Sequence, residues 1–320
     1  MNFSLQKILS RRSPVSSAYI SLIACVFLAL LGIALGVVES SLAVRTNGIV
    51  AAIDIVNSLV LVAAVNRSIR SPDYIFNYGY GKYEALGLLL SAMMLLVTLG
   101  FTMYQAIVDW KQVNTVQSYP ILMAFTVVSL IVMMYIARVQ TRRAVRFDMP
   151  MLNYDADMWK TDSLIEAFVL IGLAAGWILT EMKFKNAARF VDGISAVVLL
   201  LIALRVPIKH GREAINQLLD KTLSETIQFD ILAVVAENFT NFCEFKTVHS
   251  RQSGKDIFVE IDVVMPYDYT FEQAYPIEQQ IKAAIKEKFP TAIPRMYVVP
   301  CGRECIKDGV CYCPMKQAHS

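Results

Sequence analysis

The chain has 320 residues, of which 56% are hydrophobic and only 18% carry a charge, and its mean hydropathy is +0.48. This composition excludes an ordinary soluble protein and predicts a chain that lies in large part in the lipid bilayer. The formal net charge of +3 is small, and the polar part of the sequence holds no compact basic patch with interleaved aromatic residues, so nucleic acid is excluded as a partner.

Long apolar runs with few charges make up most of the first two thirds of the chain. A run of about 20 residues is the length that crosses roughly 30 Å of hydrocarbon as a helix. Six such runs occur, at approximately 17–38, 47–66, 86–108, 119–138, 162–180 and 190–208. The segment MNFSLQKILSRRSP before the first run is basic, but the run itself is long and lacks a small-residue cleavage pattern, so we expect a membrane helix rather than a removable signal peptide. The sequence therefore predicts six transmembrane helices.

Lys and Arg residues near the ends of the predicted helices indicate the orientation, because cytoplasmic loops are enriched in positive charge. One side of the membrane carries more of them, namely Lys7, Arg11, Arg12, Arg67, Arg70, Lys82, Arg138, Arg142, Arg143, Arg146 and Lys160. The loop EMKFKNAAR on the opposite side argues weakly the other way. The bias predicts that both termini of this integral membrane protein lie in the cytoplasm. We expect the protein in the plasma membrane.

Carboxylates interrupt the second and fifth apolar runs at helical spacing. A charged residue at the bilayer centre costs about 2.5–3.5 kcal/mol on insertion scales, so such residues usually face a bundle interior and mark a pathway. In the fifth segment one helix stripe holds Asp155, Met158, Asp162 and Glu166. In the second a similar stripe holds Asn47, Val50 and Asp54. The two stripes predict one shared intramembrane site.

A different interpretation applies to the acids close to helix starts. Asp155, Asp157 and Asp192 are more often caps or interfacial groups than ligands, because negative charge is favourable at the positive end of a helix. Asp54 and Asp162 lie deeper, and no Lys or Arg lies mid-helix to pair with them. A buried carboxylate without a fixed positive partner must be protonated or must bind a cation. Both states indicate a cation pathway.

The sequence changes character after about residue 210. KDIFVEIDVVMP alternates as a strand does, and FEQAYPIEQQIKAAIKEKF repeats apolar residues at helical spacing. We therefore expect a transmembrane domain over residues 1–210, a cytoplasmic domain over 211–300 and a cysteine-rich tail over 301–320.

The tail contains four cysteines, Cys301, Cys305, Cys311 and Cys313. Four thiolates suit tetrahedral zinc or another soft metal, but the spacing C-x3-C-x5-C-x-C lacks the usual C-x-x-C pairs. Disulfides fit poorly with a reducing, cytoplasmic side. Metal binding by the tail and a disordered or redox-reactive segment are equal alternatives.

Two segments carry a family pattern. NGIVAAID, which ends at Asp54, and DADMWKTD, which ends at Asp162, match D-x-x-[HD]-x-x-x-D in part. Four further segments match the family, and all six occur in the family's order along the chain; the four are PDYIFNYGYGKYEALGLLLS, VDGISAVVLLLIAL, GREAINQLLD and HSRQSGKDIFVEIDVVM. On these segments the chain resembles the cation diffusion facilitator, or cation efflux, family of divalent-metal transporters. In that family the last two polar positions of each pattern form a tetrahedral metal site. The resemblance implies Asp54 and Asp162 as ligands, with Val50 and Met158 at the positions of the other two.

The resemblance also implies the fold class, six transmembrane helices followed by a small cytoplasmic α/β domain similar to a metallochaperone, and a homodimer formed through that domain. In this domain we expect helices and strands near 223–237, 245–250, 256–264, 271–288 and 294–299. The positions of the family's cytoplasmic binuclear metal site align with Lys246, Asp262, Tyr275, Tyr297 and Val299. Only Asp262 is able to bind a metal, so we expect that site to be absent.

All three histidines lie outside the apolar runs, so the predicted membrane site contains no imidazole. A carboxylate-rich site without histidine suits Mn²⁺ or Fe²⁺, whereas Met158 favours a softer ion such as Zn²⁺. Water or the side chains of Asn47, Asp155 or Glu166 complete the ligand shell in this interpretation.

We hypothesise a divalent-cation exporter that works by alternating access and proton antiport, with the metal ion as its transported substrate. The alternative is a non-transporting metal-binding or regulatory membrane subunit, because two ligand positions of the family are lost. An enzyme is not expected, since the sequence holds no phosphate-binding Gly-rich loop, no G-x-S-x-G and no H-E-x-x-H.

Overall fold

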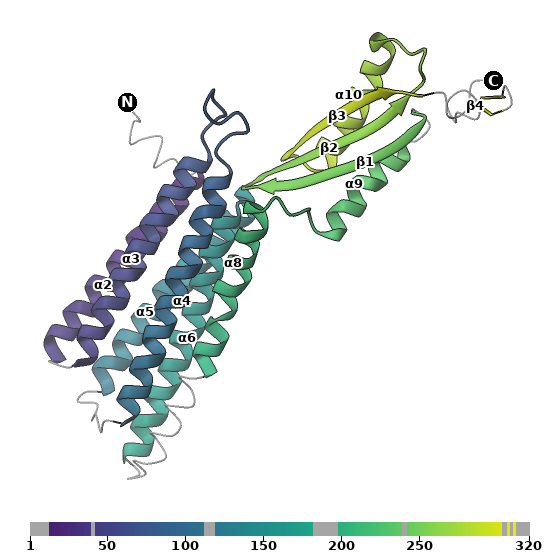
Figure 1. The fold of residues 1–320 in the computed structure, drawn as a ribbon. Coiled ribbons are helices and arrows are strands. Elements are labelled where there is room, and N and C mark those ends of the chain that lie inside the picture. The colour runs from purple at the N-terminus through teal and green to yellow at the C-terminus, as the bar shows by residue number, and fades with distance from the viewer. Residues whose placement is uncertain are drawn as a thin grey trace. The chain divides into compact units, whose positions relative to one another are not determined.

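The computed structural model describes residues 13–39, 42–111, 119–181, 198–238, 242–302, 306–307 and 310–311. Only the backbone is described for residues 35–39, 42–52, 105–106, 108–111, 119, 179–181, 306–307 and 310–311. The chain forms two compact units, residues 1–215 and 216–320. Figure 1 shows long helices in the first unit and a sheet with helices in the second.

The first unit consists of helices that run side by side (Figure 1). They are α2 (Pro14–Glu39), α3 (Leu42–Ser68), α4 (Lys82–Lys111), α5 (Tyr119–Phe147), α6 (Pro150–Glu181) and α8 (Arg205–Leu218). Among the described residues, four stretches are long and apolar enough to cross a membrane, namely Pro14–Ala34, Lys82–Tyr104, Pro120–Phe147 and Pro150–Ile178. The helical membrane domain is therefore confirmed. The number six stays a prediction, because the predicted span 47–66 in α3 is not among these four stretches and part of the predicted span 190–208 lies outside the described residues.

The polar segment between the fourth and fifth apolar runs is helical rather than a loop. α5 continues to Phe147 and α6 already begins at Pro150. Asp148 makes the turn with φ of 48°, and proline favours the first position of a helix because it has no N–H to leave unpaired. Charged residues end an apolar run but do not end a helix. As a result Asp155 lies within the second turn of α6, so its interpretation as a helix cap is wrong.

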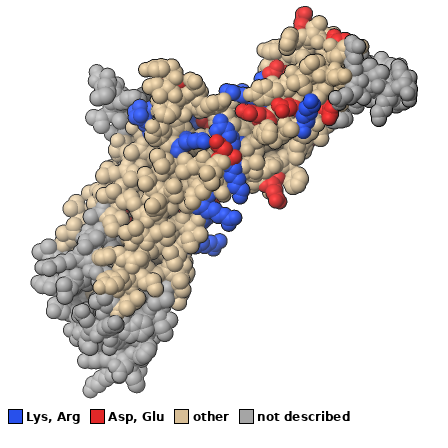
Figure 2. All heavy atoms as spheres, in the orientation of Figure 1, with Lys and Arg blue, Asp and Glu red and all other residues tan. Residues whose placement is uncertain are grey.

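Charged side chains mark one end of the first unit. The α3–α4 and α5–α6 connections both lie at this end (Figure 1). On the face that Figure 2 shows, Lys and Arg gather toward one end of the described helices, and most of their remaining length carries no charge. This distribution fits a bilayer around the uncharged length and a basic surface beyond it.

A small residue brings two of these helices close together. A Cβ atom added to Gly87 of α4 would lie 2.3 Å from the Cβ of Ala64 in α3. No larger side chain fits without separating the helices, and small residues at such crossings are common in membranes because they let backbones approach. The crossing fixes α3, which carries Asp54, against α4.

The loop between α3 and α4 is organised around Asp73. Its Oδ1 accepts a hydrogen bond from the backbone N–H of Phe76 at 2.8 Å, and its Oδ2 accepts one from the hydroxyl of Tyr80 at 2.6 Å. The Tyr80 hydroxyl, followed by the N–H of Phe76, lowers the pKa of Asp73. The rings of Phe76 and Tyr80 lie 4.6 Å apart. Phe76 and Tyr80 thus order the loop ahead of α4.

The second unit is a three-stranded sheet with two helices. Its elements are α9 (Glu225–Glu237), β1 (Glu244–Ser253), β2 (Asp256–Met265), α10 (Phe271–Lys288) and β3 (Ala292–Pro300), followed by the short strands β4 (Ile306–Lys307) and β5 (Val310–Cys311). β1 pairs antiparallel with β2, and β2 pairs parallel with β3. A parallel pair needs a crossover, which α10 provides. The predicted helices and strands of this domain are confirmed to within three residues.

Both helices of the second unit cover the same face of the sheet. Alternate residues of β2 face one way, and those at the core pack with residues of α9 and α10, the set being Val259, Ile261, Val263, Ile231, Ile281 and Ile285. On the opposite face of β3, Ile293 and Tyr297 are exposed. One face of the sheet is therefore a core, and the other presents apolar side chains at the surface.

Candidate functional site

A cavity of about 320 Å³ lies inside the first unit among α2, α3, α5 and α6. Five of the six side chains that the sequence predicted for the membrane site line it, namely Asp54, Asp155, Met158, Asp162 and Glu166. The sixth, Asn47, belongs to α3, but its side chain lies outside the described residues, as does that of Val50. Segments more than 100 residues apart in the sequence thus meet at one cavity.

Asp54 from α3 and Asp162 from α6 are the two acids at the centre of the prediction. Asp162 lies close enough to Asp54, Asp155 and Glu166 to interact electrostatically with all three. Within the described part of the chain, no Lys or Arg forms an ion pair with Asp54 or Asp162. Like charges gathered without a counter-charge require neutralisation from outside, by a proton or a cation.

Asp155 joins two helices as well as lining the cavity. Its Oδ1 accepts a hydrogen bond from the Ser21 hydroxyl of α2 at 2.7 Å, and Trp159 Nε1 donates to the same Ser21 oxygen at 2.6 Å. The Asp155 side chain is 6% exposed, and its Oδ2 has no hydrogen-bond partner among the described residues. One carboxylate oxygen of Asp155 therefore ties α6 to α2.

Glu166 is similarly engaged, because the Ser129 hydroxyl of α5 donates a hydrogen bond to its Oε1. The side chain of Glu166 is half-buried and lines the cavity. Glu166 thus connects α6 to α5, one helical turn beyond Asp162.

The Met158 sulfur lies in a polar contact that the sequence did not reveal. Asn57 Nδ2 donates to Met158 Sδ at 3.5 Å and to the Tyr154 hydroxyl oxygen at 3.4 Å. Asn57 itself lines the cavity and is 8% exposed. Its position three residues after Asp54, on the same face of α3, is the signal that could have found it.

The carboxylates share a cavity but not one ligand shell. Among the residues that the structure describes, no three His, Cys, Asp or Glu side chains converge closely enough to hold a metal ion. An ion at Asp54 and Asp162 would therefore take its remaining ligands from other groups. The cavity lining offers the sulfur atoms of Met158 and Cys25 and the amide of Asn57.

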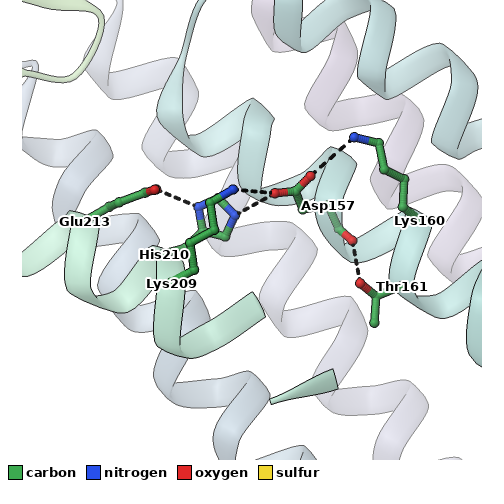
Figure 3. Close-up of polar contacts among 6 residues, drawn as sticks. All are labelled: Asp157, Lys160, Thr161, Lys209, His210 and Glu213. Carbon is green, nitrogen blue, oxygen red and sulfur yellow. Dashed lines mark hydrogen bonds and ion pairs between the residues drawn. The ribbon is translucent and has the colours of Figure 1, made fainter. Parts of the chain in front are cut away.

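A second polar cluster connects α6 to α8 (Figure 3). His210 is 1% exposed, and its ring nitrogens lie 2.9 Å from Glu213 Oε2 and 3.1 Å from Asp157 Oδ2. Lys209 and Lys160 also pair with Asp157, at 2.9 Å and 3.3 Å. Asp157 is thus neither a helix cap nor part of the cavity, and His210, although buried, does not line the cavity.

His210 is the buried partner of Asp157, whereas Lys209 is half-exposed. Replacing His210 by leucine is expected to lower the free energy of unfolding by about 1–3 kcal/mol, because Asp157 and Glu213 each lose a partner. Lys209→Leu removes an exposed ion pair from the same carboxylate and should cost less than about 1 kcal/mol. Thermal unfolding of the two variants in detergent compares them, and equal losses would show that burial of the imidazole contributes nothing.

The cysteine tail is described only in part. Cys301 follows β3, and its backbone N–H donates to the carbonyl of Met265 at 2.8 Å. Cys311 lies in β5, with its side chain outside the description, and Cys305 and Cys313 lie outside the described residues. A metal site in the tail therefore stays a prediction.

In the second unit, Asp262 lies on β2 and accepts a hydrogen bond from the Thr247 hydroxyl at 2.9 Å. Tyr297 of β3 is its neighbour in the parallel register. The expected loss of the family's cytoplasmic metal site stays a prediction.

Comparison with known proteins covers both units. Residues 18–219 match the cation efflux transmembrane domain, and residues 224–293 match the cytoplasmic domain of cation efflux proteins. The cation-efflux pump FieF of Serratia proteamaculans is 25% identical over 256 residues, 78% of this chain and 80% of its own. The FieF protein of Klebsiella pneumoniae is 26% identical over 245 residues, 74% and 76% of the two chains. The manganese efflux system protein MneP of Bacillus subtilis is 22% identical over 282 residues, which cover 88% of this chain and 94% of MneP.

Proposed function

This chain belongs to the cation efflux family, and on that premise we propose that it exports a divalent metal cation from the cytoplasm in exchange for protons. The observation that carries the proposal is the cavity to which α3 contributes Asp54 and α6 contributes Asp162. Two acids in a membrane domain with no ion-pair partner among the described residues favour a site that a cation or protons occupy in turn.

The exchange follows from the charge of the two acids. With a divalent ion bound, both carboxylates are ionised and the site is neutral. When the ion leaves, the empty site regains neutrality by taking up protons, since charge in an apolar interior is costly. If the cavity opens to one side at a time, metal and protons move in opposite directions.

The donor atoms narrow the choice of ion to Mn²⁺, Fe²⁺ or Zn²⁺. Carboxylates suit Mn²⁺ and Fe²⁺, whereas the thioether of Met158 and the thiol of Cys25, both at the cavity, favour softer ions. The relatives named for cation efflux and for manganese efflux agree with a divalent ion. The site in this proposal contains no histidine, because His210 packs at α8 and away from the cavity lining.

The assembly belongs to the same proposal. Residues 224–293 match the cytoplasmic domain of the family, and the sheet face with exposed Ile293 and Tyr297 suits pairing with a second copy. The proposed orientation puts both termini and the basic end of the helices in the cytoplasm, with the protein in the plasma membrane.

The alternative is a membrane subunit of the same family that binds metal or regulates a partner without transport. The lost ligand positions at Val50 and Met158 favour it. The transporter is the better supported of the two because the two acids that remain face one internal cavity.

Metal uptake into proteoliposomes tests the proposal directly. Mn²⁺ added outside vesicles that contain the protein is expected to enter through molecules whose cytoplasmic side faces out, and protons should leave, so that a pH-sensitive dye in the lumen reports alkalinisation. Protein-free vesicles serve as the control, and Fe²⁺ and Zn²⁺ are tested in parallel. Uptake without a change in lumen pH would reject antiport, and binding of metal without uptake of any of the three ions would favour the non-transporting alternative.

A further inference from the structure

We propose that the carbonyl oxygen of Asn57 is a further ligand of the transported cation, held in place by Tyr154. The inference rests on the proposed function and deepens it. In this chain the ligand missing at Val50, four residues before Asp54, is replaced by one three residues after Asp54 on the same helix.

The position of Asn57 meets the first requirement of a ligand. It lines the same cavity as Asp54, Met158 and Asp162. Residues three apart on a helix share a face, so Asn57 and Asp54 present their side chains from neighbouring turns of α3. The side chain of Asn57 is 8% exposed, so water competes little for it.

The hydrogen bonds of Tyr154 fix which end of the amide faces which group. The Tyr154 hydroxyl has a single proton and donates it to the backbone carbonyl of Ser91 at 3.1 Å. Its oxygen must therefore accept from Asn57, so the NH₂ end of the amide and not the carbonyl end lies toward Tyr154, at 3.4 Å. The thioether of Met158 is also only an acceptor, and it lies 3.5 Å from the same Nδ2.

In this arrangement both protons of the Asn57 amide are donated, to Tyr154 and to Met158, and the carbonyl oxygen takes part in neither contact. Oδ1 of Asn57 is buried and has no hydrogen-bond partner among the described residues. Buried amide oxygens almost always have a partner, because leaving one unmatched is costly. The neighbouring carboxylates of Asp54 and Asp162 would attract a cation into the cavity, and this cation would be the partner of the Asn57 carbonyl oxygen.

The chemistry of the amide suits a divalent ion held by two aspartates. Two carboxylates already balance the charge of a dication, so a third, neutral oxygen adds a ligand without adding charge. An amide oxygen is a hard donor, and it moves the site toward ions that accept oxygen ligands, such as Mn²⁺, and away from ions that require imidazole or thiolate. Asn57 is therefore a determinant of selectivity as well as affinity.

Mn²⁺ binding to the full-length protein in detergent tests the role of Asn57, with the loss of the free Mn²⁺ signal in electron paramagnetic resonance as the readout. Asn57→Leu keeps the approximate size of the side chain and removes the oxygen, so the dissociation constant should rise about 10–100-fold. Asn57→Asp keeps an oxygen at the same place and should bind Mn²⁺ at least tenfold more tightly than Asn57→Leu does. Asn66→Leu, the same change at an exposed position of α3, is the matched control.

Tyr154 acts through Asn57, and a double-mutant comparison separates this positioning role from a structural one. Tyr154→Phe should weaken Mn²⁺ binding several-fold in the wild-type background, because the amide then lacks the acceptor that orients it. In the Asn57→Asp background the same change should have little effect, because a carboxylate has no amide to orient. Equal weakening in both backgrounds would show that Tyr154 only maintains the fold.

Three outcomes distinguish failure of this inference from failure of the proposed function. If Asn57→Leu unfolds at the same temperature as the wild type and binds Mn²⁺ equally well, while Asp162→Asn loses binding, Asn57 is not a ligand and the two-aspartate site stands. If Asn57→Leu does not fold, unchanged Mn²⁺ affinity in Tyr154→Phe overturns the inference instead. Absence of Mn²⁺, Fe²⁺ and Zn²⁺ binding by the wild type would overturn both.

Discussion

Replacing Asp162 by asparagine is expected to abolish metal transport, with flux reduced by about a hundredfold or more, and Asp54→Asn should do the same. Loss of a group that only supports a metal ligand already costs about 10–100-fold in affinity, and loss of a charged ligand should cost more. Asparagine keeps the shape of the side chain but cannot ionise. The remaining carboxylate balances only one of the two charges of the ion, and the other stays exposed to an apolar interior.

The same substitutions should remove proton movement together with metal movement. An amide at position 162 neither releases a proton when the metal arrives nor takes one up when it leaves. In proteoliposomes, both the uptake of Mn²⁺ and the alkalinisation of the lumen should therefore disappear. A variant that lost only one of the two would show that metal and protons use different groups.

Asp148→Asn provides the matched control. Asp148 is exposed in the turn between α5 and α6, where its φ is 48°, and asparagine tolerates this left-handed backbone region well. The control should transport as the wild type does. Undiminished flux in either Asp54→Asn or Asp162→Asn, with the variant folded, would reject the assigned site.

The two stripes of polar residues show how far the sequence alone could go. Asp54 and Asp162 were singled out because a carboxylate within an apolar run costs free energy and usually marks a functional site. Both line one cavity. Helical spacing also placed Met158 and Glu166 correctly on that face of α6. That these side chains share one face was predictable because the periodicity of a helix is a local property that the order of residues determines; their role as metal ligands stays a prediction.

Asn57 and His210 were missed for a different physical reason. Both depend on which groups from other helices lie opposite: Asn57 on Tyr154 of α6, and His210 on Asp157 of α6. Spacing along α3 places Asn57 on the same face as Asp54. Spacing does not reveal the partner on another helix that orients a side chain. The start of α6 was also misplaced, since apolarity indicates the part of a helix in lipid and not the position where the helix begins.

The second large effect concerns the choice of ion and is expected from Met158→His. Met158 lines the cavity from α6, one helical turn before Asp162, and its sulfur is a weak ligand for a divalent ion. An imidazole there would add a strong nitrogen ligand next to the two aspartates. Zn²⁺ prefers such mixed nitrogen and oxygen sites, whereas Mn²⁺ gains less from nitrogen.

The ratio of Zn²⁺ to Mn²⁺ affinity should therefore rise about tenfold or more in Met158→His. Competition between the two ions for the detergent-solubilised protein measures this ratio, and uptake of each ion into proteoliposomes shows whether transport follows binding. Met158→Leu keeps the apolar volume without any donor atom, so it isolates the contribution of the sulfur and should change the ratio far less. If the histidine and leucine variants shifted the ratio equally, the side chain at position 158 would not reach the ion. Asp54 and Asp162 would then bind the ion without a contribution from position 158.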